Sequence, residues 1–337
     1  MRFIGNKEKL ALIIFELLEQ IGIIKKSKTF FDVFAGSASM GKFFKQRGLQ
    51  IYSCDLLYFS YCMQRAYLTN NDKSNYAVML EYLNNIPLKE GFIYQNYAPS
   101  GSKKLGIERK YFSDENAMKI DSMRLEIEGL KNTNTINENE YFILLATLIE
   151  SVSLFANVAG VYAAFCKQWD KRALKPFYLK KLELLESKQE HYCFCTDSIG
   201  LLENFKDKSF DILYVDPPYN HRQYAPNYHI LETIARYDSP PIKGIAGLRE
   251  WQGQKSLFCN AKSALDSLER LAKLKNYRIL ALSYNNEGLM QKEQITELLK
   301  SFGTLHFEEF NYPRFKSNNT SAQKFIKEYL WILERNS

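Results

Sequence analysis

The feature that most constrains this chain is a hydrophobic strand that runs directly into two consecutive prolines. Phe210–Val215 has the composition of a buried strand, and Asp216, Pro217, Pro218 and Tyr219 follow it at once. A proline has no backbone N–H and a fixed φ, so two in a row end both strands and helices. The chain therefore turns rigidly here, with one carboxylate and one aromatic ring on the turn. At the carboxyl end of a strand in a parallel sheet, such a turn faces the crevice where ligands bind.

The pattern of strands and helices around this turn predicts a parallel α/β sheet. Near the N-terminus, a strand, a turn of small residues, a helix and a second strand follow one another, and Gly48 suits the end of that helix. The expected elements are helices over Lys9–Ile21 and Met40–Arg47 and strands over Thr29–Phe34, Leu49–Ser53, His191–Thr196, Phe210–Val215, Tyr277–Leu282 and Thr304–Phe310.

The middle of the chain interrupts this sheet. A chain of 337 residues is too long for one small core, so a large domain with an insertion is expected. Strand alternation lapses from about Asn70 to Pro176, where Asn96–Arg109 reads as a long loop and Tyr141–Phe165 as a long helix, with Gly160 a candidate position for a break. We therefore expect a sheet domain made of residues 1–69 and 177–337, with an inserted, mainly helical or loop region at residues 70–176.

A run of small residues follows the first expected strand, beyond Asp32. Phe34–Ala38 lets the backbone approach a ligand closely, and the next helix presents its positive N-terminal end. Asp55 ends the second strand, where an acid accepts hydrogen bonds from ribose hydroxyls. The set indicates a nucleoside cofactor; the alternative is a tight strand–helix turn capped by Asp55. Lys7 either pairs with a cofactor carboxylate or begins a solvated helix.

The turn that begins at Asp216 fits a planar base with an exocyclic amino group. The prolines hold the Asp216 carboxylate and the neighbouring carbonyls in one direction, outside any strand ladder. Tyr219 offers a flat face for a planar ring. The alternative is a proline-rich turn with a structural role only.

The order of these motifs resembles that of a known enzyme family. Phe3–Lys7, then Phe34–Ala38, then an insertion, then Asp216–Tyr219 resembles the group alpha DNA adenine-N6 methyltransferases, the deoxyadenosine methylase family. The resemblance extends from residue 2 to about residue 290. Ala38 departs from it, because the family usually has a second glycine there. Alanine is small, so we expect less backbone freedom but no loss of the pocket.

The resemblance implies a Rossmann-like methyltransferase sheet that binds S-adenosylmethionine (SAM) as methyl donor. Phe34, Gly36 and Ala38 would line the SAM pocket, and Asp55 would hold the ribose. Lys7 would approach the methionine end. The cofactor-binding candidates are Lys7, Asp32, Phe34, Gly36, Ala38, Asp55 and Asp197. Asp197 resembles an acid near the cofactor adenine; equally, it would cap a helix over Ile199–Asn204.

The resemblance also implies that Asp216, Pro217, Pro218 and Tyr219 bind the target adenine. The adenine amino nitrogen is a poor nucleophile, and hydrogen bonds to Asp216 and a main-chain carbonyl would orient and activate it. Because a duplex hides this amino group, the base must be flipped out of double-stranded DNA, and Tyr219 would stack on it. No metal is expected, since the histidines have no matching cluster of cysteines or acids.

Basic and polar residues inside and after the insertion are candidates for DNA contact. The net charge of +7 permits a polyanionic partner. Each basic set is equally well explained as a solvated face, and the polar set as an ordinary loop. The candidates are Lys103, Lys104, Arg109, Lys110, Lys167, Arg172, Arg222, Asn227 and Tyr228. In addition, we expect Lys243–Lys255 to close over DNA and Ser283–Gly288 to lie near the flipped base.

Other acceptors and a non-catalytic role stay open at this point. The same turn would suit cytosine-N4 or RNA adenine methylation, and a nucleic-acid-binding protein with a degenerate SAM pocket is the alternative from another class. We expect a cytoplasmic protein with reduced cysteines, since neither a signal peptide nor a membrane span is visible. It would be a monomer or weak dimer in a methylation or restriction–modification system, with any cognate endonuclease acting separately.

Overall fold

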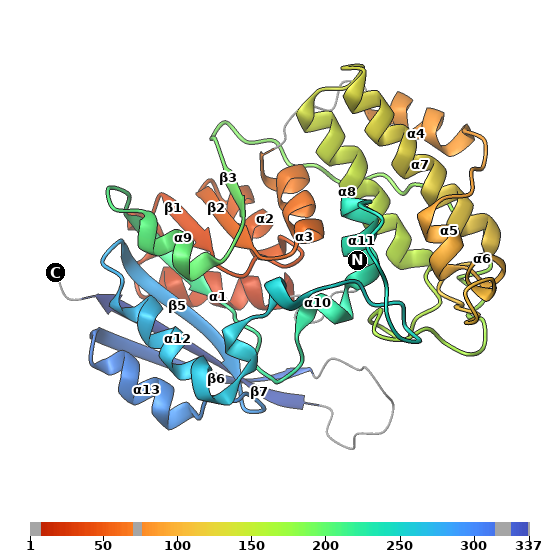
Figure 1. The fold of residues 1–337 in the computed structure, drawn as a ribbon. Helices are drawn as coiled ribbons and strands as arrows, with labels where there is room; N and C mark the ends of the chain where they lie inside the picture. Colours follow the sequence, from red (N-terminus) through yellow and green to blue (C-terminus); the bar gives the residue numbers. More distant parts are fainter. Residues whose placement is uncertain (1–7, 70–75, 314–324, 336–337) are drawn as a thin grey trace. The chain divides into compact units, whose positions relative to one another are not determined.

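The chain folds into two units, which the computed structural model describes over residues 8–69, 76–313 and 325–335. One unit comprises residues 8–56, 187–224, 254–313 and 325–335, and we call it the α/β unit. The other comprises residues 57–69, 76–186 and 225–253. We call it the helical unit, because the elements described in it are helices and turns (Figure 1).

The α/β unit is built on a seven-stranded sheet. It is mostly parallel, as the sequence predicts, but the last strand, Phe325–Arg335, was not among the expected ones. The strand order is β3-β2-β1-β4-β5-β7-β6. The first five strands in this order run parallel, and β7 pairs antiparallel with both β5 and β6. The strands are β1 Thr29–Asp32, β2 Gln50–Asp55, β3 Tyr192–Cys195, β4 Phe210–Val215, β5 Tyr277–Asn285, β6 Gly303–Pro313 and β7 Phe325–Arg335.

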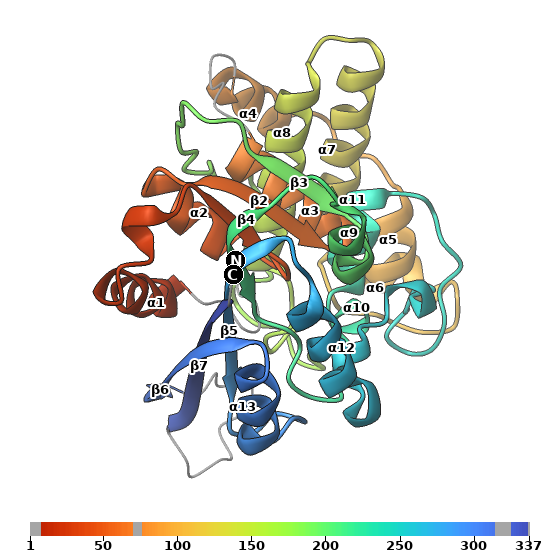
Figure 2. The same cartoon turned by 90° about the vertical axis from the view of Figure 1, so that its left-hand side faces the viewer.

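Helices cover both faces of this sheet, which is the doubly wound arrangement (Figure 2). Successive strand residues point to opposite faces, so Phe30 stacks on Phe44 of α2 with ring centroids 4.0 Å apart. Phe31 instead joins a buried cluster that includes residues of α9, α12 and α13. The helices of this unit are α1 Glu8–Gln20, α2 Ser39–Gln46, α9 Ser198–Asn204, α12 Ala261–Lys273 and α13 Lys292–Lys300, with short 3-10 turns at Ile24–Lys26 and Leu257–Cys259.

The point where the chain reverses its order across the sheet lies between β1 and β4. These strands pair in parallel, with Asp32 opposite Tyr214. From β1 the sheet continues to β2, whereas from β4 it continues to β5 in the other direction. The carboxyl ends of two such strands open a crevice, which is where doubly wound proteins bind ligands.

Two expectations about secondary structure in the middle of the chain are wrong. The expected loop Asn96–Arg109 contains the end of α5 and all of α6, which begins with a proline at a position where a helix accepts one. The helix expected to reach Phe165 ends at Phe155, after which the backbone is extended. The helices are α3 Tyr58–Gln64, α4 Tyr76–Asn85, α5 Phe92–Tyr97, α6 Pro99–Lys103, α7 Asp114–Asn132, α8 Glu138–Phe155, α10 Tyr224–Asn227 and α11 His229–Arg236, with a π turn at Arg65–Thr69 and a 3-10 turn at Gln252–Gln254.

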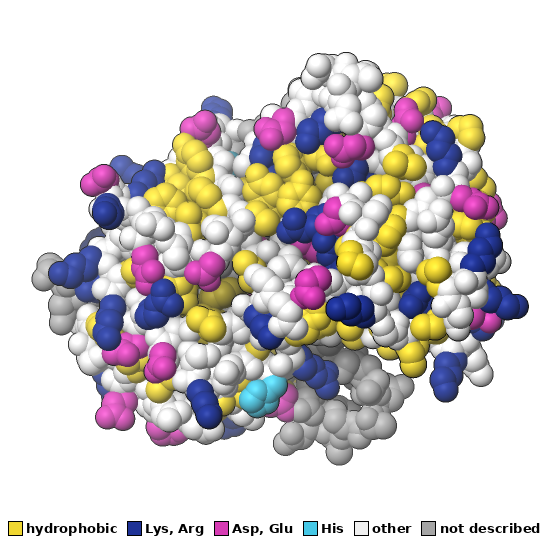
Figure 3. All heavy atoms as spheres, in the orientation of Figure 1, with side chains coloured by type: hydrophobic (Ala, Val, Ile, Leu, Met, Phe, Trp, Pro, Cys, Tyr) yellow, Lys and Arg dark blue, Asp and Glu magenta, His cyan; other side chains and the backbone are white. Residues whose placement is uncertain are grey.

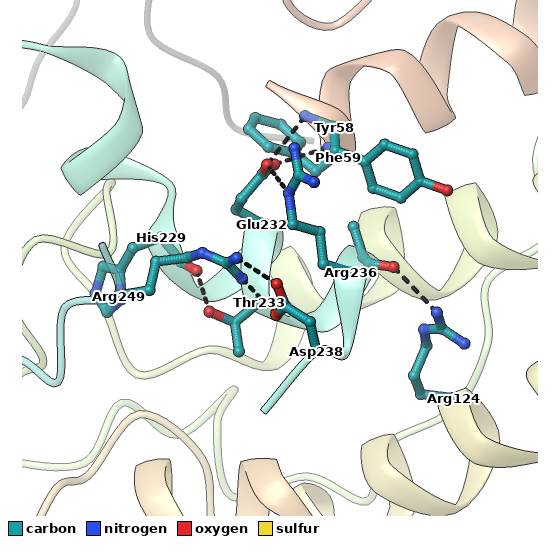
Figure 4. A network of polar contacts seen from close by, with 10 residues as sticks. Tyr58, Phe59, Arg124, His229, Glu232, Thr233, Arg236, Asp238 and Arg249 are labelled. Carbon is teal, nitrogen blue, oxygen red and sulfur yellow. Dashed lines mark hydrogen bonds and ion pairs between the residues drawn. The ribbon is translucent and has the colours of Figure 1, made fainter. Parts of the chain in front are cut away.

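The helical unit also takes in a segment from after the proline turn, which the boundaries 70–176 omit. Glu232 on α11 accepts hydrogen bonds from the backbone N–H groups of Tyr58 (3.1 Å) and Phe59 (2.9 Å), at the start of α3 (Figure 4). Arg124 on α7 donates to the carbonyls of Ile234 (2.9 Å) and Ala235 (3.1 Å), at the end of α11. These buried bonds satisfy helix ends of both segments, so residues 225–253 fold with residues 57–186.

The remaining sequence-wide expectations concern membranes and cysteines. Across the described ranges, no helix combines the length and hydropathy that a membrane crossing needs. None of the six cysteines, all within the described ranges, forms a disulfide.

Candidate active site

The proline turn (Asp216–Tyr219) follows the carboxyl end of β4, whose neighbour in the sheet is β1. Strand β4 has the predicted bounds Phe210–Val215, and its last four residues are buried. Asp216 and Tyr219 follow it as half-buried residues, and Pro217 is buried between them. The sheet thus anchors the turn and leaves the carboxylate and the ring partly accessible.

The end of β5 holds this turn in place. The carbonyl of Tyr219 accepts hydrogen bonds from the Leu289 N–H (2.9 Å) and from the Tyr284 hydroxyl (3.3 Å). The same hydroxyl accepts from the N–H groups of Leu289 (2.9 Å) and Met290 (3.3 Å). Tyr284 is 1% exposed. The sequence predicted that Ser283–Gly288 lies near the base. It did not predict that the Tyr284 hydroxyl links this segment to the proline turn.

The small-residue turn (Phe34–Ala38) follows β1 and has a backbone that few residues adopt. Gly36 has φ 51° and Ala38 has φ 61°, both in the left-handed region. Asp55 at the end of β2 accepts from the Gly36 N–H at 2.8 Å. The structure therefore supports the alternative in which Asp55 holds the strand–helix turn, and its role as the ribose acceptor stays a prediction.

Ala38 is more constrained than the sequence suggested. It is fully buried and precedes α2, in a conformation that glycine adopts without cost. An L-residue with a Cβ is disfavoured there by about 1–2 kcal/mol. Alanine at this position therefore strains the backbone locally. Hydrogen bonds such as that from the Ala38 N–H to the Ala35 carbonyl (2.7 Å) keep the backbone in this conformation.

Asp32 is a buried acid directly beside these turns. It is 1% exposed, and neither carboxylate oxygen has a hydrogen-bond partner among the described residues. Burial first, and then the negative charges of Asp216 and Asp55, raise its pKa well above the ordinary value. Nearby backbone N–H groups offset this only in part. Three acids thus meet at the carboxyl ends of β1, β2 and β4, which favours a positively charged ligand.

The other cofactor candidates have varied surroundings. Asp197 is exposed and caps α9, accepting from the Gly200 N–H at 2.7 Å, so the capping interpretation is confirmed. Its role beside a cofactor stays a prediction. Phe34 is half-buried and packs edge-to-face on Phe258, with centroids 5.3 Å apart. Lys7 lies outside the described residues.

Two of the DNA-contact candidates are interior residues of the helical unit, and both assignments need correction. Arg109 is 4% exposed, and its guanidinium donates to backbone carbonyls of Asn96, Gly244 and Ile245. Tyr228 is fully buried, with its ring 5.5 Å from that of Phe59. Bonding to carbonyls and packing against rings satisfy these side chains inside the protein, away from a phosphate backbone.

The other basic candidates lie closer to solvent. Lys103, Lys104 and Lys167 are exposed. Lys110 pairs with Glu108 at 3.3 Å, and Arg172 makes a fork with Asp170. Figure 3 shows Lys and Arg side chains scattered among acidic and hydrophobic ones on the face drawn there.

The remaining two polar candidates flank the boundary between the units in the sequence. Arg222 is exposed in the α/β unit. Asn227 is half-buried in the helical unit, and its carbonyl accepts from the Tyr162 N–H at 2.8 Å. Both side chains keep enough accessibility for their predicted DNA contact to stand.

The expectation about metals rests on His221 and His229. His229 is buried, and its Nε2 lies 2.9 Å from the Tyr162 carbonyl. Burial lowers the pKa of His229 to about 4, so the ring is neutral. Within residues 8–69, 76–313 and 325–335, no group of three metal-ligating side chains gathers.

Comparison with known proteins agrees with the geometry. A family described as D12 class N6 adenine-specific DNA methyltransferase matches residues 3–310. The chain is 40% identical to the type II methyltransferase M.NlaIII of Neisseria lactamica over 99% of both chains. It is 38% identical to the type II methyltransferase M.FokI of Planomicrobium okeanokoites and 35% identical to the modification methylase StsI of Streptococcus sanguinis. In these two comparisons 99% of this chain aligns with 53% of M.FokI and 52% of StsI, so this chain corresponds to about half the length of each.

Proposed function

Because this chain belongs to the D12 class of N6 adenine-specific DNA methyltransferases, we propose that it takes a methyl group from SAM and places it on an adenine held by the proline turn. The observation that carries the proposal is the pairing of β1 with β4, which brings Asp32 and Asp216 to one crevice. DNA is the substrate of this class, which sets aside RNA and cytosine-N4 as acceptors.

The residues of the α/β unit fit SAM. Gly36 carries no side chain, so a ligand can approach its backbone closely. The Asp32 carboxylate, buried and without a hydrogen-bond partner among the described residues, needs a donor or a cation. SAM is a cation at both its sulfonium and its amino group. When bound, SAM supplies an activated methyl group, which the acceptor nitrogen takes as it loses one proton.

The proline turn orients the acceptor. Asp216 accepts a hydrogen bond from the adenine amino group, which draws electron density toward the nitrogen. The Tyr219 ring stacks on the base, and such stacking contributes about 1–3 kcal/mol per base. The prolines keep both groups fixed, so little ordering is needed when the base arrives. An adenine in a duplex reaches this turn only after it is extruded from the stack.

The biological setting follows from the relatives. Type II methyltransferases and modification methylases are the names that the similar proteins carry. We propose that this chain modifies DNA in a restriction–modification system, with a separate endonuclease that reads the same sequence. It acts on its site as a monomer or weak dimer.

The test is to identify the methylated nucleoside. Purified protein is incubated with labelled SAM and duplex DNA, and the DNA is digested to nucleosides. N6-methyladenine is expected from the wild type, and none from Asp216→Ala, which should still bind SAM. Label in N4-methylcytosine would overturn the proposal, and wild-type activity in Asp216→Ala would overturn the role of the turn.

A further inference from the structure

The two ends of the β1–β4 strand pair treat their acids differently. At the amino end, Asp211 accepts hydrogen bonds from the backbone N–H groups of Lys28 (2.8 Å) and Thr29 (3.0 Å) and from the Thr29 hydroxyl (3.1 Å). Its carboxylate also lies 3.8 Å from Arg278. At the carboxyl end, Asp32 is 1% exposed, and neither of its oxygens has a hydrogen-bond partner among the described residues. The fold thus satisfies the first acid and buries the second without one.

The side chains that face Asp32 from the neighbouring strands add negative charge. Asp32 lies opposite Ser53 of β2 and Tyr214 of β4. Side chains alternate between the two faces along a strand, so a residue two positions further on returns to the same face. Asp55 and Asp216 hold these positions, and their negative charges oppose ionisation of Asp32.

Helix α2 packs on this side of the sheet. The backbone N–H groups of Phe34 and Gly41 favour the Asp32 carboxylate, but burial and the two acids outweigh them. Lys45 is buried one turn beyond Gly41, and burial and then this lysine lower the pKa of His191, just before β3. Among the described residues, therefore, no cation is a main influence on Asp32.

A carboxyl group in these surroundings holds a proton rather than a charge. An ionised carboxylate that is buried without a partner costs so much free energy that the group neutralises instead. The Tyr214 hydroxyl beside it is also neutral, because burial and then the charges of Asp216 and Asp32 raise its pKa. A cation bound nearby reverses the balance at Asp32, since an opposite charge favours the ionised form.

We propose that Asp32 is protonated in the free protein and releases its proton when SAM binds. This inference rests on the proposed function, in which the α/β unit binds SAM. SAM brings positive charge at its sulfonium and its amino group. The O–H bond of Asp32 breaks, the electron pair stays on the carboxylate, and the proton passes to water, to which the half-buried Asp216 offers a path. A cation thus replaces a proton, and the buried site stays close to neutral.

The experiment counts the protons that leave when SAM binds. SAM is titrated into the protein by calorimetry at about pH 6, in two buffers of different ionisation enthalpy. We expect the wild type to release about one proton per SAM and Asp32→Asn, which has no ionisable group, to release close to none. Asp211→Asn is the matched control, because it replaces an acid of the same strand pair at the opposite end of the sheet. It should release as many protons as the wild type.

The pH dependence of SAM affinity gives a second readout. In the wild type, affinity should rise about tenfold per pH unit from about pH 5 upward, and level off once Asp32 is ionised in the free protein. The amino group of SAM stays charged over this range, since α-amino groups titrate near pH 8. S-adenosylhomocysteine, which lacks the sulfonium charge, distinguishes the two cations. Proton release with both ligands assigns the amino group as the partner of Asp32, and release with SAM alone assigns the sulfonium.

Three outcomes overturn the inference. They are SAM binding without proton release, a SAM affinity that does not change with pH, and equal proton release by the wild type and Asp32→Asn. If Asp32→Asn binds SAM too weakly for calorimetry, infrared difference spectra of the wild type replace it. Loss of a protonated-carboxyl band on SAM binding supports the inference, and an unchanged band overturns it. A wild type that binds no SAM at all overturns the proposed function and this inference with it, so the two failures are distinguishable.

Discussion

Gly288→Ala should impair methyl transfer, although Gly288 lies 69 residues beyond the Tyr219 of the proline turn. A Cβ at this position would lie 2.0 Å from Tyr284 Cε1, 2.5 Å from Cζ and 2.8 Å from the hydroxyl oxygen. Tyr284 is buried, so its ring cannot move aside freely. The ring or the following turn must shift, and either movement disturbs the hydrogen bonds to the Tyr219 carbonyl.

The size of the effect follows from these contacts. Overpacking a buried site costs about 1–3 kcal/mol, and each disturbed hydrogen bond adds about 0.5–1.5 kcal/mol. We therefore expect the free energy of unfolding to fall by about 2–4 kcal/mol. A displacement of the acceptor site by about 1 Å lowers a rate on the order of 100-fold.

The assay is single-turnover methylation with saturating SAM and duplex, alongside urea unfolding. Gly129→Ala on α7 is the matched control, because it adds the same methyl group where no atom lies within 4 Å. That variant should keep the wild-type rate and gain up to about 1 kcal/mol of stability from helix propensity. If Gly288→Ala keeps both the rate and the stability of the wild type, the coupling between Tyr284 and the proline turn is refuted.

Three further predictions concern the cofactor site, the DNA surface and pH. Asp55→Ala should weaken SAM binding more than DNA binding, because it removes the acceptor of the Gly36 N–H; calorimetry that finds an unchanged SAM affinity would contradict this. Replacing Lys103 and Lys104 by alanine should weaken DNA binding. It should also make the slope of log affinity against log salt less steep by about 2, the value for two lost phosphate contacts, and an unchanged slope would identify a solvated face. The raised pKa of Asp32 means that the folded state holds its proton more tightly than the unfolded chain, so this residue lowers stability as pH rises above the ordinary aspartate value of about 4. Asp32→Asn should therefore be more stable than the wild type in urea at neutral pH, with the difference vanishing near pH 4, and a difference independent of pH would contradict the burial of a shifted acid.

The sequence by itself determined the parallel part of the sheet and the place of its two turns, but not the antiparallel strand β7. Strand β4 has the predicted bounds because a run of apolar residues before two prolines has one local outcome. The turn at Phe34–Ala38 follows from small residues between a strand and a helix. Such features depend on residues that are neighbours in the chain, so they can be predicted from the sequence without knowledge of the fold.

Tertiary structure decided which basic and aromatic residues face solvent. Arg109 and Lys110 are adjacent in the chain, yet the first is bonded to buried carbonyls and the second pairs with Glu108 on the surface. Nothing in their spacing separates these outcomes, because two of the three carbonyls that bind Arg109 come from residues 135 and 136 positions later. The recruitment of residues 225–253 into the helical unit has the same cause. Buried polar groups must find partners, and the partners that lie far along the chain become neighbours only when the chain is folded.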